Sequence, residues 1–308
     1  MRTRRTIAAA MSVLALTAVA ACGKSGSPSD NAAGGSAAPK PPTYQVKTDV
    51  KLTGSKTFDN AKKRGHLVIG AKSDQPFLGF EDLSAGSGAS ARSGFDIEIA
   101  RMVAADLGFG PDQIEWKTIA SANRENALSG DGDHQIDFYV GTYTINEKRK
   151  AQVSFAGPYL VAGQDLLVAK DNTTITGPES VKDKSVCSVT GSTSIDNITP
   201  YGAKITKYET YSQCVDKLMT GEVDAVTTDD AILKGYAAKN PDKLKVVGKP
   251  FTKEPYGVGL AKDDSVLRNA INDALKAHED NGDWKKAYDA TLGLSGAPAS
   301  AVPALERY

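Results

Sequence analysis

The chain has 308 residues, 40% of them hydrophobic and 24% charged, and its 37 Lys and Arg residues balance 37 Asp and Glu residues. This is the composition of a soluble globular protein of one large or two medium domains, and the zero net charge argues against nucleic-acid binding or attachment to a membrane through basic patches. Three scattered histidines and three cysteines cannot form a zinc site of paired Cys-x-x-Cys motifs, so we expect neither a metal nor a cofactor.

Residues 1–21 predict a secretory signal peptide. Arg2, Arg4 and Arg5 form a basic start, and an apolar run follows over 7–21. The run is too short to span a bilayer comfortably and ends in small residues, as a signal peptide does. The rest of a twin-arginine motif is missing, so we expect ordinary secretion; the alternative is a buried N-terminal helix.

Cys22 is predicted to carry a lipid. It follows an aliphatic residue and two alanines, which together resemble a bacterial lipobox, where the cysteine becomes the mature N-terminus and carries acyl chains such as palmitate. Residues 23–42 are mostly Gly, Ser, Ala and Pro and cannot bury enough apolar area to offset their ordering entropy. We therefore expect the lipidated cysteine and a flexible tether over 22–55, which hold the folded part on the extracytoplasmic face of the cell membrane.

Strands and helices are expected to alternate along the folded part. A buried strand at 67–70 precedes a helix that begins at Phe95 with Asp96 as its N-cap. The remaining expected elements are strands at 114–118, 136–143, 185–189, 223–227, 244–247 and 256–260, and helices at 124–128, 212–220, 230–238, 266–275 and 284–292. Such alternation implies parallel sheets with helices on both faces, the α/β class.

Two long extended runs, 158–169 and 244–260, predict that the chain crosses twice between two lobes. The expected division is lobe 1 at 56–160 plus 250–294, lobe 2 at 161–249, and a disordered tail at 295–308. A ligand would then bind in the cleft between the lobes, at the carboxyl ends of strands. Two crossovers form a hinge that permits closure around it.

Cys187 and Cys214 are the two remaining cysteines, and an extracytoplasmic location favours a disulfide between them. Cys187 lies in a predicted strand, and Cys214 lies on the apolar face of a predicted helix that also carries Tyr211. A disulfide here would contribute about 3–4 kcal/mol in the loop-entropy estimate. Two buried free thiols are the alternative.

Two stretches carry a family resemblance. Residues 94–99, GFDIEI, resemble the signature of the bacterial extracellular solute-binding proteins of family 3, which bind polar amino acids. Residues 137–149, DFYVGTYTINEKR, are similar to the strand and turn with which that family binds its ligand. The resemblance implies that Gly141, Thr142 and Thr144 contact the ligand. It also implies that Arg149 grips the α-carboxylate of the ligand, a role that its planar guanidinium suits.

Two further stretches resemble the second half of the family's site. VTGST at 189–193 corresponds to a turn whose Ser192 and Thr193 bind the same carboxylate, and an ordinary helix cap is the alternative. In VDAVTTDD at 223–230, the resemblance implies that Asp229 pairs with the α-ammonium group. A helix N-cap is again the plainer interpretation, and Arg149 alone could be a solvated surface arginine.

The ligand side chain is indicated by SANRE at 121–125, which resembles a segment of acidic amino-acid binders. In those proteins the arginine, here Arg124, meets the distal carboxylate, and Lys72 lies where they place a second cation. Both side chains could instead be solvated. The closest resemblance over 56–294 is to glutamate-binding lipoproteins of Gram-positive ABC importers, carried by FAGPY at 155–159, GQDLLV at 163–168, VCSVTGST at 186–193 and EPYGVGL at 254–260.

The resemblance implies a monomer with the two-lobed, type II periplasmic-binding-protein fold, in which two three-layer α/β lobes are joined by a two-strand hinge. It implies that the protein binds glutamate, performs no catalysis, and delivers the ligand to a permease driven by an ATPase. The alternatives are a glutamine, asparagine or aspartate binder, and an enzyme similar to cyclohexadienyl dehydratase. Such an enzyme would need a general acid or base in the cleft, and no histidine falls in these stretches.

Overall fold

A computed structural model of the chain describes residues 39–86, 89–129, 136–297 and 301–308. The predicted signal peptide at 1–21 and the predicted lipidation site at Cys22 lie outside the described residues. Within the described ranges, no helix combines the length and apolar character needed to cross a bilayer.

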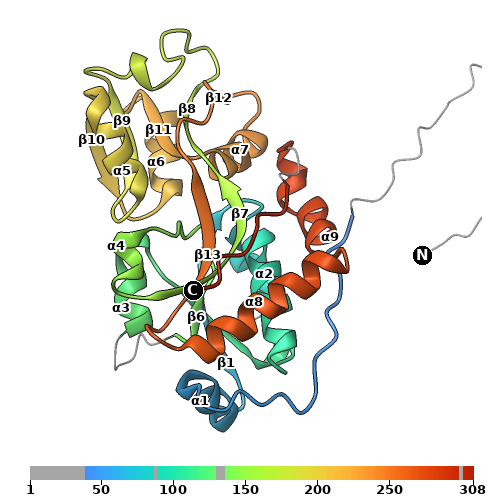
Figure 1. Ribbon diagram of the computed structural model, residues 1–308. Coiled ribbons are helices and arrows are strands. Elements are labelled where there is room, and N and C mark those ends of the chain that lie inside the picture. The colour runs from blue at the N-terminus through green and yellow to red at the C-terminus, as the bar shows by residue number, and fades with distance from the viewer. Residues whose placement is uncertain (1–38, 87–88, 130–135, 298–300) are drawn as a thin grey trace, which may run out of the picture. The chain divides into compact units, whose positions relative to one another are not determined.

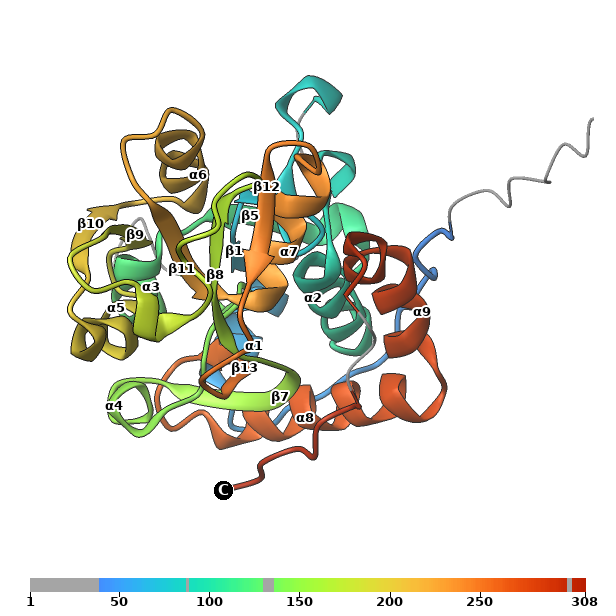
Figure 2. The same cartoon turned by 90° about the horizontal axis from the view of Figure 1, so that it is seen from above.

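Two five-stranded sheets organise the described chain (Figures 1 and 2). The first has the order β5 (Ile114–Thr118), β1 (Leu67–Ala71), β6 (Phe138–Tyr139), β13 (Glu254–Leu260) and β7 (Ser154–Ala162). The second has the order β10 (Lys204–Tyr208), β9 (Ser185–Val189), β11 (Ala225–Asp229), β8 (Gln164–Ala169) and β12 (Leu244–Val247). We call the first sheet with its helices lobe 1 and the second with its helices lobe 2.

Both sheets are mixed, which corrects the expectation of parallel sheets. β1 pairs in parallel with β5 and β6, and β9 pairs in parallel with β10 and β11. The other pairings, those of β13 with β6 and β7 and of β8 with β11 and β12, are antiparallel. The reason is that β7, β8, β12 and β13 belong to the crossings between the sheets, and only Gly163 separates β7 from β8. A strand that enters a sheet from the other lobe does not follow a βα unit of that sheet, so it can run antiparallel to its neighbours.

The helices flank these sheets. Lobe 1 carries α1 (Lys56–Arg64), α2 (Phe95–Asp106), α3 (Arg124–Ser129), α4 (Glu147–Lys150), α8 (Ser265–Asp280) and α9 (Asp283–Ala290), and lobe 2 carries α5 (Thr193–Ile198), α6 (Tyr211–Met219) and α7 (Asp230–Lys239). A small sheet of β2 (Asp74–Gln75), β3 (Gly79–Glu81) and β4 (Arg92–Ser93) follows β1. The predicted long helices are present because their apolar faces, such as Leu267, Ile271 and Leu275 of α8, are buried.

Several local expectations are wrong. The strand expected at 136–143 is paired only at Phe138–Tyr139, and the chain turns soon after, where Thr142 has a positive φ of 47°. The N-cap of α2 is Gly94 rather than Asp96, whose buried carboxylate accepts hydrogen bonds from Thr142 N at 3.1 Å and Tyr159 OH at 2.8 Å. Asp96 therefore supports the turn at Thr142 instead of capping the start of the helix.

Two segments expected to be flexible, the tether before the folded part and the tail after it, form specific contacts with the folded part. In the tether, the hydroxyl of Tyr44 donates to Glu98 at 2.9 Å and Lys47 pairs with Asp106. In the tail, Glu306 N donates to the Gly157 carbonyl at 2.7 Å, and the Tyr308 hydroxyl accepts from Phe155 N at 3.0 Å. A composition rich in Ala and Pro does not reveal such single pairings, because each depends on one side chain or one backbone group.

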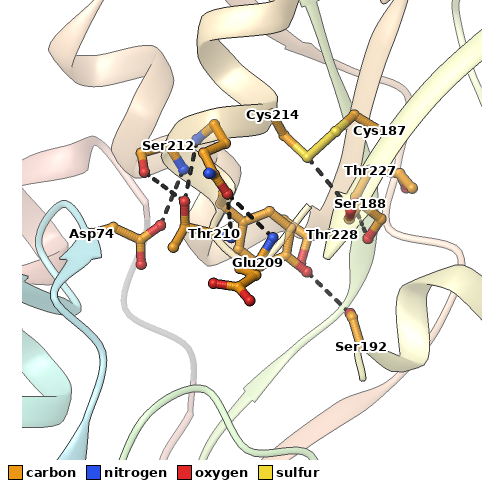
Figure 3. Close-up of a disulfide and its surroundings, with 12 residues drawn as sticks. Asp74, Cys187, Ser188, Ser192, Glu209, Thr210, Ser212, Cys214, Thr227 and Thr228 are labelled. Atoms are coloured by element: carbon orange, nitrogen blue, oxygen red, sulfur yellow. Dashed lines mark hydrogen bonds between the residues drawn. A yellow bond between two sulfur atoms is a disulfide. The ribbon is translucent and has the colours of Figure 1, made fainter. Parts of the chain in front are cut away.

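The structure has the disulfide that the sequence predicts between Cys187 and Cys214 (Figure 3). It joins β9 to α6 inside lobe 2, and both cysteines are fully buried. The α6 helix is thereby fixed to the central part of the second sheet.

Candidate functional site

A small cavity lies between the two lobes, beside the carboxyl ends of several strands. Lobe 1 lines it with Ser121, Arg124, Thr142, Thr144 and Arg149, and lobe 2 lines it with Ser192, Thr193, Tyr211, Thr228, Asp229 and Ile232. Its volume is about 10 Å³, roughly the space of one water molecule. An amino acid can enter only if the lobes move apart.

Arg149 is buried at this cavity on the single turn of α4. The helix begins after Asn146, whose side chain accepts a hydrogen bond from Arg149 N at 2.9 Å, so the chain turns back toward the strand end. The guanidinium donates to the carbonyl oxygens of Thr144 at 2.7 Å and Gly191 at 3.1 Å. Burial, followed by repulsion from Arg124, lowers the pKa of Arg149 to about 10, so the side chain is charged at neutral pH.

Arg124 places a second cation beside the first. Its Nη2 donates to the same Gly191 carbonyl at 3.0 Å, and its Nε donates to the Ser121 carbonyl at 3.0 Å. Both guanidinium groups lie over the ring of Tyr143, Arg124 at 4.2 Å and Arg149 at 4.9 Å from its centre. The shared aromatic ring and Glu125, whose Oε1 lies 3.6 Å from Arg149 Nε, offset part of the repulsion between the two cations, and the pair can bind anionic groups.

Asp229 supplies the opposite charge from lobe 2. It ends β11, and its Oδ2 accepts a hydrogen bond from Tyr256 OH at 2.6 Å. Its Oδ1 is buried and has no hydrogen-bond partner among the described residues. Burial, followed by repulsion from Glu254, raises the pKa of Asp229 to about 7. A buried carboxylate oxygen without a partner is costly, so this site favours a cationic ligand group that would donate to it.

Two of the sequence candidates do not line the cavity. Lys72 is buried, donates to Ser121 Oγ at 2.8 Å, and has its pKa lowered to about 7 by burial and then by Arg124. Lys72 therefore supports a cavity residue without lining the cavity itself. Gly141 is required for packing, because a Cβ there would lie 2.6 Å from the Tyr139 hydroxyl.

The sequence interpretation missed two hydroxyl groups of lobe 2, those of Tyr211 and Thr228, which form a row with the predicted Ser192. Thr228 Oγ1 donates to Tyr211 OH at 2.6 Å, which in turn donates to Ser192 Oγ at 3.0 Å. Tyr211 was assigned to the apolar face of its helix, and Thr228 directly precedes the candidate Asp229. Ser121, which also lines the cavity, is the first residue of the SANRE stretch. Ile232 lines the cavity as well, and no sequence signal identified it.

A wider cavity of about 410 Å³ opens next to the first and shares Ser121, Arg149, Ser192 and Thr193 with it. Its lining comes from both lobes and includes Arg149 and Glu125 but not Arg124, so this face of the cleft leads toward Arg149. In the described ranges, no group of three or more His, Cys, Asp or Glu side chains has the arrangement needed to hold a metal ion.

Comparisons with known proteins agree with this geometry. The model of the bacterial extracellular solute-binding proteins, family 3, matches residues 67–293. The chain is 38% identical to the glutamate-binding protein GluB of Corynebacterium efficiens, over 76% of this chain and 81% of the relative. It is 34% identical to the glutamine-binding protein of Geobacillus stearothermophilus, over 83% and 91%.

A solved structure has the same architecture. It is the ancestral amino acid-binding protein AncCDT-1, a precursor of cyclohexadienyl dehydratase, with 31% identity, a TM-score of 0.68, and coverage of 77% of this chain and 100% of that one. The fold predicted from the sequence, the two-lobed type II periplasmic-binding fold, is therefore confirmed. Both curated relatives described above are named for binding an amino acid and not for a reaction.

Proposed function

This chain belongs to family 3 of the bacterial extracellular solute-binding proteins and serves amino-acid ABC transport, and on that premise we propose that its ligand is glutamate. The observation that carries the proposal is the charge pattern at the cleft. Two buried arginines of lobe 1 line the inner cavity with one buried, partly unpaired carboxylate of lobe 2, whereas Glu125, which lies 3.6 Å from Arg149, lines only the wider cavity. This pattern complements a ligand with two anionic groups and one cationic group.

Each charged group of glutamate has a partner in this proposal. Arg149 binds the α-carboxylate together with Ser192 and Thr193, Asp229 binds the α-ammonium, and Arg124 binds the distal carboxylate. The guanidinium donors now directed at the Gly191 carbonyl would turn to the ligand oxygens, which carry a full charge and accept stronger hydrogen bonds. Groups of both lobes would then share one ligand, and binding favours closure by that differential affinity.

The arrangement of the chain belongs to the same proposal. Lobe 1 comprises 56–160 plus 250–294 and lobe 2 comprises 161–249, with the ligand in the cleft between them. The chain acts as a monomer and passes glutamate to a membrane permease driven by a separate ATPase. A glutamine binder is the second candidate, since one of the relatives is a glutamine-binding protein.

Arg124→Ala tests the choice of glutamate. We expect the preference for glutamate over glutamine, measured by competition for a labelled ligand, to fall about tenfold or more, because the distal carboxylate would lose a charged partner. Arg124→Lys, which retains the charge without the planar fork, should lie between wild type and Arg124→Ala. An unchanged ratio in Arg124→Ala would exclude this residue as the distal partner, and a wild-type preference for glutamine would favour the second candidate.

Gly191→Ala tests closure of the lobes. Gly191 of lobe 2 has a φ of +82°, and a Cβ there would lie 2.8 Å from Ala122 N and Cα of lobe 1. We expect the Kd for glutamate to rise about tenfold, because the added carbon holds the lobes apart. The matched control is Gly221→Ala, since Gly221 has a φ of +77° and no atom within 4 Å of the added carbon. Equal Kd values for the two variants in calorimetry would contradict the role of Gly191.

The lipid anchor is the last part of the proposal. Cys22 follows the lipobox-like residues and precedes the tether, so lipidation at Cys22 would hold the binding protein at the cell membrane beside its permease. Mass spectrometry of the N-terminal peptide from the membrane fraction tests this. An acylated Cys22 as the first residue is expected, and an unmodified thiol at that position would contradict the anchor.

A further inference from the structure

Asp74 connects lobe 1 to two helices of lobe 2. It lies on β2, and its Oδ2 accepts a hydrogen bond from the backbone N–H of Ser212 on α6 at 3.1 Å (Figure 3). The hydroxyl of Tyr236 on α7 donates to the Asp74 carbonyl at 2.5 Å and lies 3.3 Å from Oδ2. One residue of lobe 1 therefore accepts hydrogen bonds from both α6 and α7.

The start of α6 leaves a donor for this carboxylate. The N-cap Thr210 accepts a hydrogen bond from Gln213 N, and Gln213 Oε1 in turn accepts from Thr210 N. This capping box satisfies donors on either side of Ser212 N, and the Ser212 N–H points to Asp74 instead. A carboxylate at the start of a helix is also stabilised by the helix dipole.

The neighbouring residues show that the approach is close. A Cβ on Gly235 of α7 would lie 2.5 Å from the Pro76 carbonyl oxygen, so only glycine permits this contact between the lobes. The Lys239 ammonium lies 5.0 Å from the centre of the Phe77 ring. The segment 74–77 of lobe 1 thus packs against α7 while Asp74 also reaches α6.

The same turn of α6 forms part of the ligand cavity. Tyr211, directly before Ser212, lines the cavity and hydrogen-bonds Ser192 and Thr228. Cys214, one turn further along α6, is tied to β9 by the disulfide. Asp74 therefore hydrogen-bonds to the turn of α6 that the disulfide fixes to the second sheet. The same turn places the hydroxyl group of Tyr211 at the cavity.

We propose that Asp74 and Tyr236 form an interlobe clasp, in which Asp74 acts as a positioning residue that holds α6 against the closed cleft and slows ligand release. The proposal rests on the proposed function, because it assumes an amino acid between the lobes. The clasp forms only when the lobes have come together, so it affects the escape of the ligand and not its capture. Its loss accelerates dissociation and leaves association nearly unchanged.

The test compares ligand kinetics of full-length variants with isotopically labelled L-glutamate, and with L-glutamine in parallel. We expect Asp74→Ala to raise the dissociation rate constant about tenfold and to change the association rate constant less than about twofold. Asp74→Asn retains an acceptor oxygen, so its dissociation rate constant should lie between those of wild type and Asp74→Ala. Tyr236→Phe should also accelerate release, whereas the control Tyr208→Phe, on edge strand β10, should not.

A merely structural role for Asp74 would lower the melting temperature without this separation of rate constants. A dissociation rate constant for Asp74→Ala equal to that of Tyr208→Phe would overturn the clasp. Small-angle scattering without amino acid is the second measurement, and wild type and Asp74→Ala should have equal radii of gyration, because the clasp forms only after the lobes close. If wild type binds neither amino acid, the proposed function fails. A larger radius of gyration for Asp74→Ala than for wild type without amino acid would overturn the clasp separately, because the contact would then act before capture.

Discussion

A chain with Arg149 replaced by alanine is expected to lose amino-acid binding, with the Kd for glutamate rising about hundredfold or more. The reason is that the guanidinium is buried and directed into the cleft, where its donors can form two parallel hydrogen bonds with one carboxylate. Alanine removes both donors and the charge, and it leaves a desolvated ligand carboxylate with fewer partners. Calorimetric titration of the full chain measures the effect.

Two controls accompany the Arg149 variant. Lys148→Ala removes the neighbouring cation of α4, which is exposed, and should leave the Kd within about twofold of wild type because exposed charges contribute little. Arg149→Lys retains a cation without the planar fork and should bind more weakly than wild type but more tightly than Arg149→Ala. Near-normal glutamate affinity in Arg149→Ala would remove this residue from the α-carboxylate site.

The second large effect is expected at Asp229. Asp229→Asn should raise the Kd at pH 8 by about thirtyfold or more, because the ligand ammonium loses its ionised partner in a buried site. The adjacent Asp230→Asn is the matched control, since Asp230 does not line the cavity and bonds to Gly163 and Lys234 instead. Similar Kd values for the two variants would place the ammonium elsewhere.

Asp229 also predicts a dependence of affinity on pH. Its pKa is raised to about 7 by burial and by the neighbouring carboxylates Glu254 and Asp230, against the opposing effects of Tyr256 and Arg149. An ammonium group binds the ionised form, so below pH 7 a proton must first leave the carboxyl group. The Kd of wild type should therefore rise as the pH falls, approaching tenfold per unit, and Asp229→Asn should give a flatter profile between pH 5 and 8. A wild-type Kd that is constant across this range would contradict the role of Asp229.

The family resemblance identified two residues that do line the cavity. Asp229 is the last residue of β11, and Arg149 lies on the short helix α4. Lys72 and Gly141 follow strands, yet both support the cavity from behind. Whether such a residue lines the cavity depends on its neighbours, here Ser121 beside Lys72 and Tyr139 beside Gly141. A sequence pattern does not contain that information.

The residues that the sequence could not place depend on contacts between distant segments. Hydrophobic periodicity correctly predicts that the ring of Tyr211 is buried, but it carries no information about which groups the hydroxyl contacts. Asp74 lies on a strand of two residues, too short for any periodicity, and its partners Ser212 and Tyr236 belong to the other lobe. Asp96 resembled a helix cap because its role in holding Thr142 exists only in the folded chain.

The central claim is that the cleft selects an amino acid with a second carboxylate, and calorimetric titration of the full chain with each common amino acid tests it most directly. Glutamate should bind one to one with a Kd of about a micromolar or less, corresponding to roughly −8 kcal/mol, and more tightly than glutamine or arginine. Tighter binding of an amino acid with a neutral or basic side chain, or no binding of glutamate, would contradict the claim.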